Sequence, residues 1–321
     1  MKIKPYIWPS IGLTAVAVCL WLLYRDLSGL SLADVASSLA AISGQNWALA
    51  AGGAVLAYTA LAGYDRVALN YLGRPMPWLF IVACSFTAYA VGHNIGASVF
   101  SGAVVRYRAY SSRGLSAAEV ATLVALCSFT FGLGTVFLGG IVLVIEPGVS
   151  ERFVAQIPFD IPSVAGALML AFVLFYAIGG WLQYEPVRIG RHRFRYPPLP
   201  IIGQQLIVAP LELVGAASII YFALPEAGNP GFMVVLGIFL ASFSVALLSH
   251  APGGIGVLEL VFLAGLPEIE PAAVLAALLV FRLFYLLIPL AFSVVVILLF
   301  ERSQLLRKSA RRRTVPDARG C

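Results

Sequence analysis

The sequence predicts an all-α, polytopic integral membrane protein with six full spans and two re-entrant hairpins, arranged as an inverted repeat. Hydrophobic residues make up 60% of its 321 residues and charged residues 11%. A water-soluble domain of this size could not cover so much apolar surface with polar groups. Basic and acidic loops also alternate along the chain, and two similar stretches, SFTAYAVGHNIG and SFSVALLSHAPGG, place His93 and His250 at the same position of each.

Six apolar segments are long enough to cross the hydrocarbon core, which takes about 20 mostly apolar residues. They lie near residues 7–24, 46–64, 117–145, 163–184, 201–223 and 271–299. The first follows Lys2 and Lys4 and is not followed by a small-residue cleavage site, so we expect a retained span. Two more apolar regions, near 78–105 and 231–266, are interrupted by Gly, Pro and His.

Loop charges predict how these segments are oriented, because Lys and Arg next to spans stay on the cytoplasmic side. If residues 78–105 crossed fully, the basic stretch RYRAYSSRG would lie outside, against this rule. We therefore expect the region to dip in from the cytoplasm and return. Region 231–266 must dip from outside, since PEIEP is acidic and the tail after the last span is basic. The protein is predicted to be a multi-pass inner (plasma) membrane protein with both termini cytoplasmic.

The resulting order of span, span, hairpin, span occurs twice with opposite orientation. We expect one transmembrane domain over residues 1–300, with repeat halves near 7–145 and 163–299, followed by a basic cytoplasmic tail at 301–321. Inverted repeats of this kind are typical of secondary transporters. The net charge of +6 resides mostly in the tail, which favours contact with anionic membrane lipids and makes nucleic acid a poor second choice.

The hairpin tips are candidate binding elements. Backbone that turns inside a bilayer persists only where it is buried in protein or lines a wet cavity. Glycines and a proline permit these turns, and the free N–H groups of the helix after PGGIG suit an anion such as a lipid phosphate. Close packing of helices on small residues is the alternative. The two tip histidines are candidates for a functional or a packing role. The tip residues concerned are Gly96, Pro252, Gly253, Gly254, His93 and His250.

Charged residues inside apolar segments are the other candidates. Glu212 and Arg282 each lie near the middle of a span, so they are predicted to pair, with substrate binding by Arg282 as the alternative. Glu259 could carry a proton. Arg106 and Arg108 are expected at headgroup depth, where a guanidinium fits a phosphate or simply anchors the helix. No cluster of His, Cys and carboxylates has the spacing of metal ligands, so no metal or cofactor is expected.

Two stretches, GHNIGASVFSGAVVRYRAYSSRGLSAAEV and SHAPGGIGVLEL, resemble the transmembrane family of lysylphosphatidylglycerol synthases and their stand-alone relatives. The resemblance covers about residues 10–300. In two-part members it implies a flippase for aminoacylated phosphatidylglycerol joined to a cytosolic synthase. No synthase part is expected here, which leaves the cargo open. The matching site candidates are His93, Gly96, Arg106, Arg108, Pro252, Gly253, Gly254 and Glu259.

The leading functional hypothesis is therefore a transporter that moves an anionic or aminoacylated phospholipid between leaflets without covalent chemistry. One alternative is a membrane enzyme acting on lipid or polyprenyl-phosphate headgroups, although the sequence has neither an H-E-x-x-H motif nor a phosphate-binding glycine loop with Lys. The other is a small-solute secondary transporter. The expected partners are a phospholipid substrate, membrane lipids and, as a further candidate, a separate lipid-synthesising enzyme.

Overall fold

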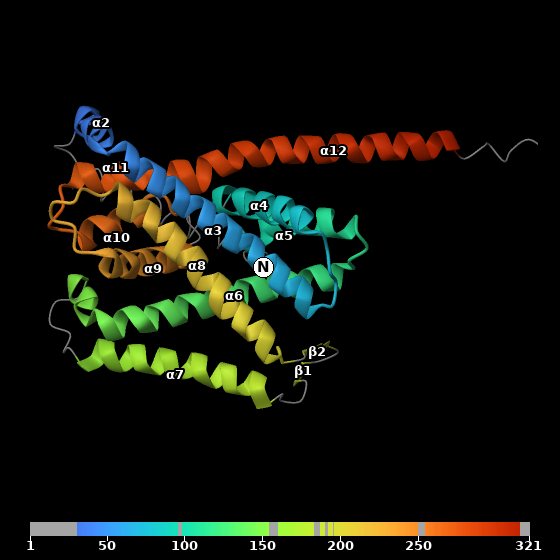
Figure 1. Cartoon of the computed structure of the whole chain (residues 1–321), viewed down its shortest axis with the longest axis horizontal. Coiled ribbons are helices and arrows are strands. Elements are labelled where there is room, and N and C mark those ends of the chain that lie inside the picture. Colours follow the sequence, from blue (N-terminus) through green and yellow to red (C-terminus); the bar gives the residue numbers. More distant parts are fainter. Residues whose placement is uncertain are drawn as a thin grey trace, which may run out of the picture.

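The computed structural model describes residues 31–95, 98–153, 160–182, 187–189, 192–194, 196–249 and 254–314 (Figure 1). This part of the chain is helical apart from one short β-hairpin. In chain order the elements are α2 (Leu32–Ala41), α3 (Gly44–Tyr71), α4 (Trp78–Ile95), α5 (Ser98–Ser111), α6 (Ala117–Ile145), η1 (Pro147–Arg152), α7 (Asp160–Leu182), β1 (Val187–Ile189), β2 (His192–Phe194), α8 (Leu199–Ala223), α9 (Phe232–Ser249), α10 (Val257–Gly265), α11 (Pro271–Phe281), the π-helix η3 (Arg282–Leu287) and α12 (Ile288–Thr314).

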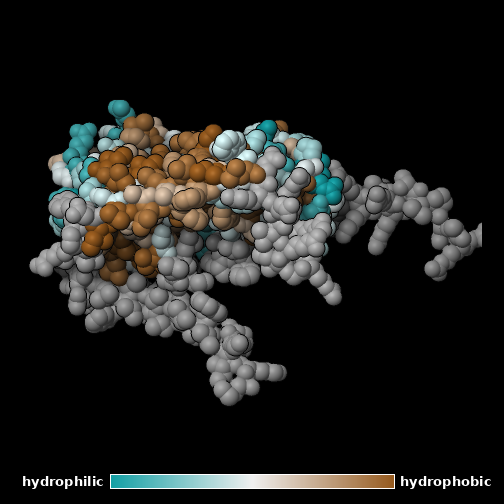
Figure 2. Space-filling model, turned by 90° about the horizontal axis from the view of Figure 1, so that it is seen from below, coloured by the Kyte–Doolittle hydropathy of each residue, from teal (hydrophilic) through white to brown (hydrophobic). Residues whose placement is uncertain are grey.

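Five helical segments are long and apolar enough to cross a membrane: Gly44–Tyr71, Ala117–Ile145, Ile161–Leu182, Leu199–Ala223 and Pro271–Phe300. They coincide with five of the predicted spans, and the predicted span at 7–24 lies outside the described residues. Figure 2 shows a band of hydrophobic side chains across the described part of one face, with hydrophilic side chains toward its two ends. The chain is thus an all-α, polytopic membrane protein.

Helices α3 and α8 pack against each other at the centre of the structure. Their backbones come close because glycines face each other across the contact. A Cβ on Gly53 would lie 2.8 Å from the carbonyl oxygen of Gly215, and a Cβ on Gly215 would lie 2.8 Å from that of Gly53. Small residues at such contacts let membrane helices approach, because dispersion contacts and not water exclusion hold them together.

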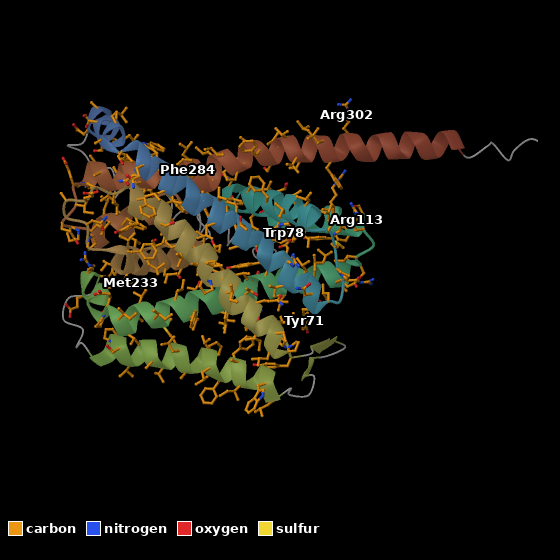
Figure 3. The ribbon with its side chains drawn as sticks, viewed as in Figure 1. Tyr71, Trp78, Arg113, Met233, Phe284 and Arg302 are labelled. Carbon is orange, nitrogen blue, oxygen red and sulfur yellow. The ribbon has the colours of Figure 1, made fainter. Side chains whose placement is uncertain are left out.

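The two regions predicted to turn back on themselves hold paired helices. Helix α4 packs against α5 to form the first hairpin, and α9 packs against α10 to form the second. Figure 3 places Trp78 and Arg113, near the two ends of the first hairpin, toward the same side of the molecule as Tyr71. Met233, near the start of the second hairpin, lies toward the opposite side. Helix α4 also packs against η3 and α12, while α9 packs against α6.

Three features of the fold were not predicted. Helix α2 begins with a capping box in which Ser31 and Asp34 bind each other's backbone N–H. Strands β1 and β2 form an antiparallel hairpin in the basic RIGRHRFR loop, with Val187 opposite Phe194. Helix α12 does not end with the apolar residues of the last span. It continues through the basic residues that follow, as far as Thr314.

Candidate functional site

Arg106 on α5 forms a buried ion pair with Asp65 on α3. The two side chains are 4% and 0% exposed, and Arg106 Nη2 lies 2.8 Å from Asp65 Oδ1. Arg106 Nε donates to both carboxylate oxygens at 3.1 Å, and the Tyr110 hydroxyl donates to Oδ2 at 2.8 Å. The guanidinium carbon also lies 4.4 Å from the ring centre of Tyr89. Both charges are therefore satisfied inside the protein, as buried charges must be.

Arg106 does not present a free guanidinium in this structure, because it is buried and bound to Asp65, and its predicted substrate-binding role stays a prediction. Helix α3 extends to Tyr71, so it carries Asp65 into the helix bundle instead of the cytoplasmic loop and places it against Arg106. Arg108 lies two positions further along α5 and is exposed. Residues two apart on a helix face different directions, so one arginine is buried while the other reaches the surface. The headgroup role of Arg108 stays a prediction.

Glu259 on α10 binds partners with both carboxylate oxygens. Oε1 accepts from Arg282 Nε at 3.1 Å and Nη2 at 2.5 Å, and Oε2 accepts from the backbone N–H of Gly256 at 2.8 Å. Gly256 and Gly254 have φ values of +84° and +64°, which favour glycine. Glu259 thus caps the first turn of α10 and holds Arg282 beside the second hairpin. The predicted substrate-binding role of Glu259 stays a prediction.

The predicted ion pair between Glu212 and Arg282 is wrong, because each side chain binds a different partner. Arg282 binds Glu259, whereas Glu212 on α8 accepts hydrogen bonds from the hydroxyls of Tyr285 at 2.5 Å and Tyr64 at 3.3 Å. Position along a helix gives the depth of a residue but not the direction in which its side chain points. Glu212 is 1% exposed, so the two tyrosines hold it in the protein interior.

The π-helix η3 receives bonds from α3 and the first hairpin. The Tyr58 hydroxyl donates to the carbonyl oxygen of Tyr285 at 2.9 Å, and Asn94 Nδ2 donates to that of Leu286 at 3.1 Å. A π-turn displaces carbonyls from the α-helical pattern, so outside donors stabilise it. Since Arg282 at the start of η3 binds Glu259, both hairpins make polar contacts with this one segment.

His93 lies near the end of α4, within this cluster. Its ring stacks on Tyr285 with centres 5.2 Å apart and an interplanar angle of 15°, and it also contacts the rings of Tyr89 and Phe243. His93 Nδ1 is buried and has no hydrogen-bond partner among the described residues. A buried polar atom without a partner is unusual. The position near a hairpin tip was predicted, whereas the aromatic stacking was not.

The tip of the second hairpin is only partly described. His250, Pro252 and Gly253, which were predicted as site residues at this tip, lie outside the described residues, and so does Gly96, which was predicted at the tip of the first hairpin. At Gly254 an added Cβ would come 2.3 Å from Leu258 Cδ1, so the chain is tightly packed there. Within the described ranges, no group of three or more His, Cys, Asp or Glu side chains is arranged to hold a metal ion.

Sequence reasoning missed Asp65, Asn94 and the tyrosines that bind Glu212. Asp65 carried a usable signal, because a carboxylate amid LAGYDRVAL is costly in a membrane helix unless it is paired. The tyrosines and Asn94 had no such signal. Tyr side chains are common near membrane interfaces, and the spacing of these residues does not indicate which neighbouring helix they face.

Comparison with known proteins identifies the family. The sequence profile of the lysylphosphatidylglycerol synthase TM region matches residues 10–293. The chain belongs to this family. A Synechocystis protein, slr0712, is 32% identical over 234 residues, which are 73% of this chain and 72% of the relative. The inner membrane protein YbhN of Escherichia coli is 29% identical over 259 residues, which are 78% of this chain and 79% of YbhN.

A third relative has a different length. Phosphatidylglycerol lysyltransferase of Staphylococcus aureus is 23% identical over 276 residues, which are 85% of this chain but 31% of the relative. The resemblance inferred from the hairpin sequences is therefore confirmed at family level. The slr0712 and YbhN proteins match over most of their own length and most of this chain, whereas the lysyltransferase contains the matching region within a longer chain.

Proposed function

We propose that this protein is a lipid transporter that moves an anionic or aminoacylated phospholipid, or a related lipid, between the leaflets of the inner membrane. The observation that carries the proposal is the pair of helical hairpins that start from opposite sides of the molecule and both bind η3. Membership of the lysylphosphatidylglycerol synthase TM region family supports a lipid as the cargo.

The proposed topology has six full spans and two re-entrant hairpins in an inverted repeat. The order α3, α4, α5, α6 corresponds to α8, α9, α10 and the α11–α12 segment. The central helices α3 and α8 pack on each other, and each hairpin contacts the last long segment of the other half. Such an arrangement lets one half rock against the other, which is how inverted-repeat carriers alternate access. We place both termini in the cytoplasm.

Arginines at the open end of the first hairpin form the proposed entrance for a headgroup. Arg66, Arg108 and Arg113 are exposed. The guanidinium carbons of Arg66 and Arg113 lie 5.4 Å and 4.6 Å from the ring centres of Trp78 and Phe80. Stacking on an aromatic ring leaves the edge of a guanidinium available to oxygen acceptors such as a phosphate. Lys or Arg near the cytoplasmic surface also attracts anionic lipid.

The proposed transport needs no covalent step, so we propose that the protein is not an enzyme. A separate lipid-synthesising enzyme is the partner that would supply a modified lipid, since in the longer relative the matching region covers 31% of a protein named as a lysyltransferase. Contacts with a phospholipid substrate and membrane lipids follow from the same proposal, and none with nucleic acid is proposed.

The test is transport by the purified full chain in liposomes. Liposomes containing fluorescent phosphatidylglycerol or phosphatidylcholine are treated with a membrane-impermeant quencher, and the rate at which protected lipid becomes accessible is measured. We expect faster exchange of the anionic lipid in protein-containing liposomes than in empty ones. If a folded wild type moves neither lipid, the transporter proposal fails and the enzyme and small-solute hypotheses gain support.

A matched pair of glycine substitutions tests the role of the second hairpin. Gly254→Val forces a β-branched residue into positive φ and against Leu258, so we expect loss of transport with retained anionic-lipid binding. Gly203→Val on α8 is the control, because nothing lies within 4 Å of an added Cβ there. Equal rates for both variants and the wild type would refute the role of this hairpin in transport.

A further inference from the structure

Glu212 differs from the other carboxylates buried within the helix bundle. Asp65 and Glu259 are paired with Arg106 and Arg282, and each pair is held by more than one hydrogen bond. Glu212 belongs to none of the ion pairs formed among the described residues. It lies in the middle of α8, about 20 Å from the start of the helix at 1.5 Å per residue. It is therefore a deeply buried acid whose charge has no counter-ion in the described structure.

The two groups that bind Glu212 are both hydroxyls, Tyr285 on Oε1 and Tyr64 on Oε2. A hydroxyl can donate or accept by rotating its hydrogen, whereas a guanidinium can only donate. With the carboxylate ionised, both tyrosines donate to it. With the carboxyl protonated, it donates to one tyrosine oxygen and accepts from the other. Glu212 therefore keeps a hydrogen bond to each tyrosine in either protonation state.

The groups around Glu212 do not fix its charge either. Four tyrosines lie close enough to interact electrostatically with it, namely Tyr58, Tyr64, Tyr89 and Tyr285. Of the other elements packed against α8, α6 carries Cys127 and, in its first turn, Glu119, which is paired with Arg74, and α7 carries Tyr176 and, at its first position, Asp160. The described α9 and α11 contain no titratable side chain. Two arginines in the helix bundle, Arg106 and Arg282, are bound to Asp65 and Glu259.

A second protonatable group lies on the other side of the same tyrosine. His93 stacks on the Tyr285 ring with centres 5.2 Å apart, and its buried Nδ1 has no hydrogen-bond partner in the part of the chain that the structure describes. In the neutral ring with hydrogen on Nε2, this atom has a free lone pair. The hydroxyl of Tyr285 therefore binds the carboxyl of Glu212, and its ring stacks against the imidazole of His93. Two proton-binding groups, one from α8 and one from α4, contact the same residue of η3.

We infer that Glu212 is a proton-binding site of this protein, and that it takes up and releases a proton during the transport cycle. The transport part rests on the proposed function. In this step a carboxylate and a hydronium ion give a carboxylic acid and water, and the reverse step returns the proton. We assign the reversed hydrogen bond to Tyr285, whose hydroxyl is the closer of the two. Because η3 also binds both hairpins through Asn94 and Arg282, this bond connects the protonation of Glu212 to the segment that the hairpins contact.

The proton site is tested without transport by infrared difference spectroscopy of the full-length protein in lipid at acidic and alkaline pH. A protonated buried carboxylic acid gives a carbonyl-stretch band that disappears when it ionises. We expect this band in the wild type, its loss in Glu212→Gln, and its retention in Glu146→Gln, which neutralises an exposed carboxylate at the end of α6. An unchanged titrating band in folded Glu212→Gln would overturn the inference.

A second pair of variants keeps the test valid if Glu212→Gln does not fold. Tyr285→Phe removes the closest hydroxyl, so the band must remain but its pH midpoint must shift. Tyr176→Phe also deletes a partly buried hydroxyl, but this one donates to Gln205, so the midpoint must stay in place. If the midpoint is the same in both variants and the wild type, the titrating acid is not Glu212 and the inference is overturned.

Liposome transport then tests the coupling. If a step needs one protonation state, its rate falls about tenfold per pH unit beyond the midpoint. We expect the wild type and Glu146→Gln to show this pH dependence and Glu212→Gln to show a flat profile. Equal pH profiles in all three would overturn coupling at Glu212. Absence of lipid transport by the wild type at every pH would instead refute the proposed function, and the infrared result would still decide whether Glu212 binds a proton.

Discussion

Replacing Asp65 by Asn tests the buried ion pair most directly. The variant keeps the size of the side chain but leaves the Arg106 guanidinium, which is 4% exposed, without its counter-charge. Breaking a buried pair by removing one partner typically costs about 3 to 5 kcal/mol. At about 1.4 kcal/mol per decade, this corresponds to a roughly 100- to 4,000-fold shift of the unfolding equilibrium. Tyr110 would still donate to the Asn carbonyl, so we expect a value within this range and not above it.

The assay is reversible denaturant unfolding in mixed micelles, followed by tryptophan fluorescence. Arg74→Gln is the control, because it breaks a pair with Glu119 in which the side chains are 51% and 23% exposed. An exposed pair contributes about 0 to 1 kcal/mol, so the control should be near the wild type. The double variant Asp65→Asn, Arg106→Gln removes both charges and should recover part of the loss. If Asp65→Asn is no less stable than Arg74→Gln, the reasoning is wrong.

Two further predictions concern packing and the π-helix. Gly53→Leu should lower the free energy of unfolding by about 1 to 3 kcal/mol, because the larger side chain overpacks against α8. Gly52→Leu should change it little, because an added Cβ there has nothing within 4 Å. Equal midpoints of the two variants in thermal unfolding would contradict the packing argument. Asn94→Ala should remove about 1 kcal/mol with the bond to the Leu286 carbonyl and speed amide hydrogen exchange in η3 more than in α6. Unchanged exchange in η3 would show that this bond does not hold the segment.

Five of the predicted spans and the positions of the helix pairs α4–α5 and α9–α10 could be predicted because they depend on local properties of the chain. A segment that crosses the membrane must be apolar over its whole length, so its limits are visible in the sequence. The predicted span at 117–145 coincides with α6, and that at 201–223 with all but two residues of α8. Gly, Pro and His interrupt the regions where α4–α5 and α9–α10 are paired, and loop charge indicated that each region returns to its starting side.

The partners of the buried charges depended on the tertiary structure. Depth along a span placed Glu212 and Arg282 at a similar level, but depth does not determine the direction of a side chain around its helix. The π-turns of η3 change that direction within a few residues, bringing Tyr285 to Glu212 while Arg282 meets Glu259. Likewise, the sequence by itself determined that an arginine follows the first hairpin tip. Only the packing of α5 on the extended α3 decided that Arg106 binds Asp65, because an ion pair between distant positions requires both helices to be oriented in space.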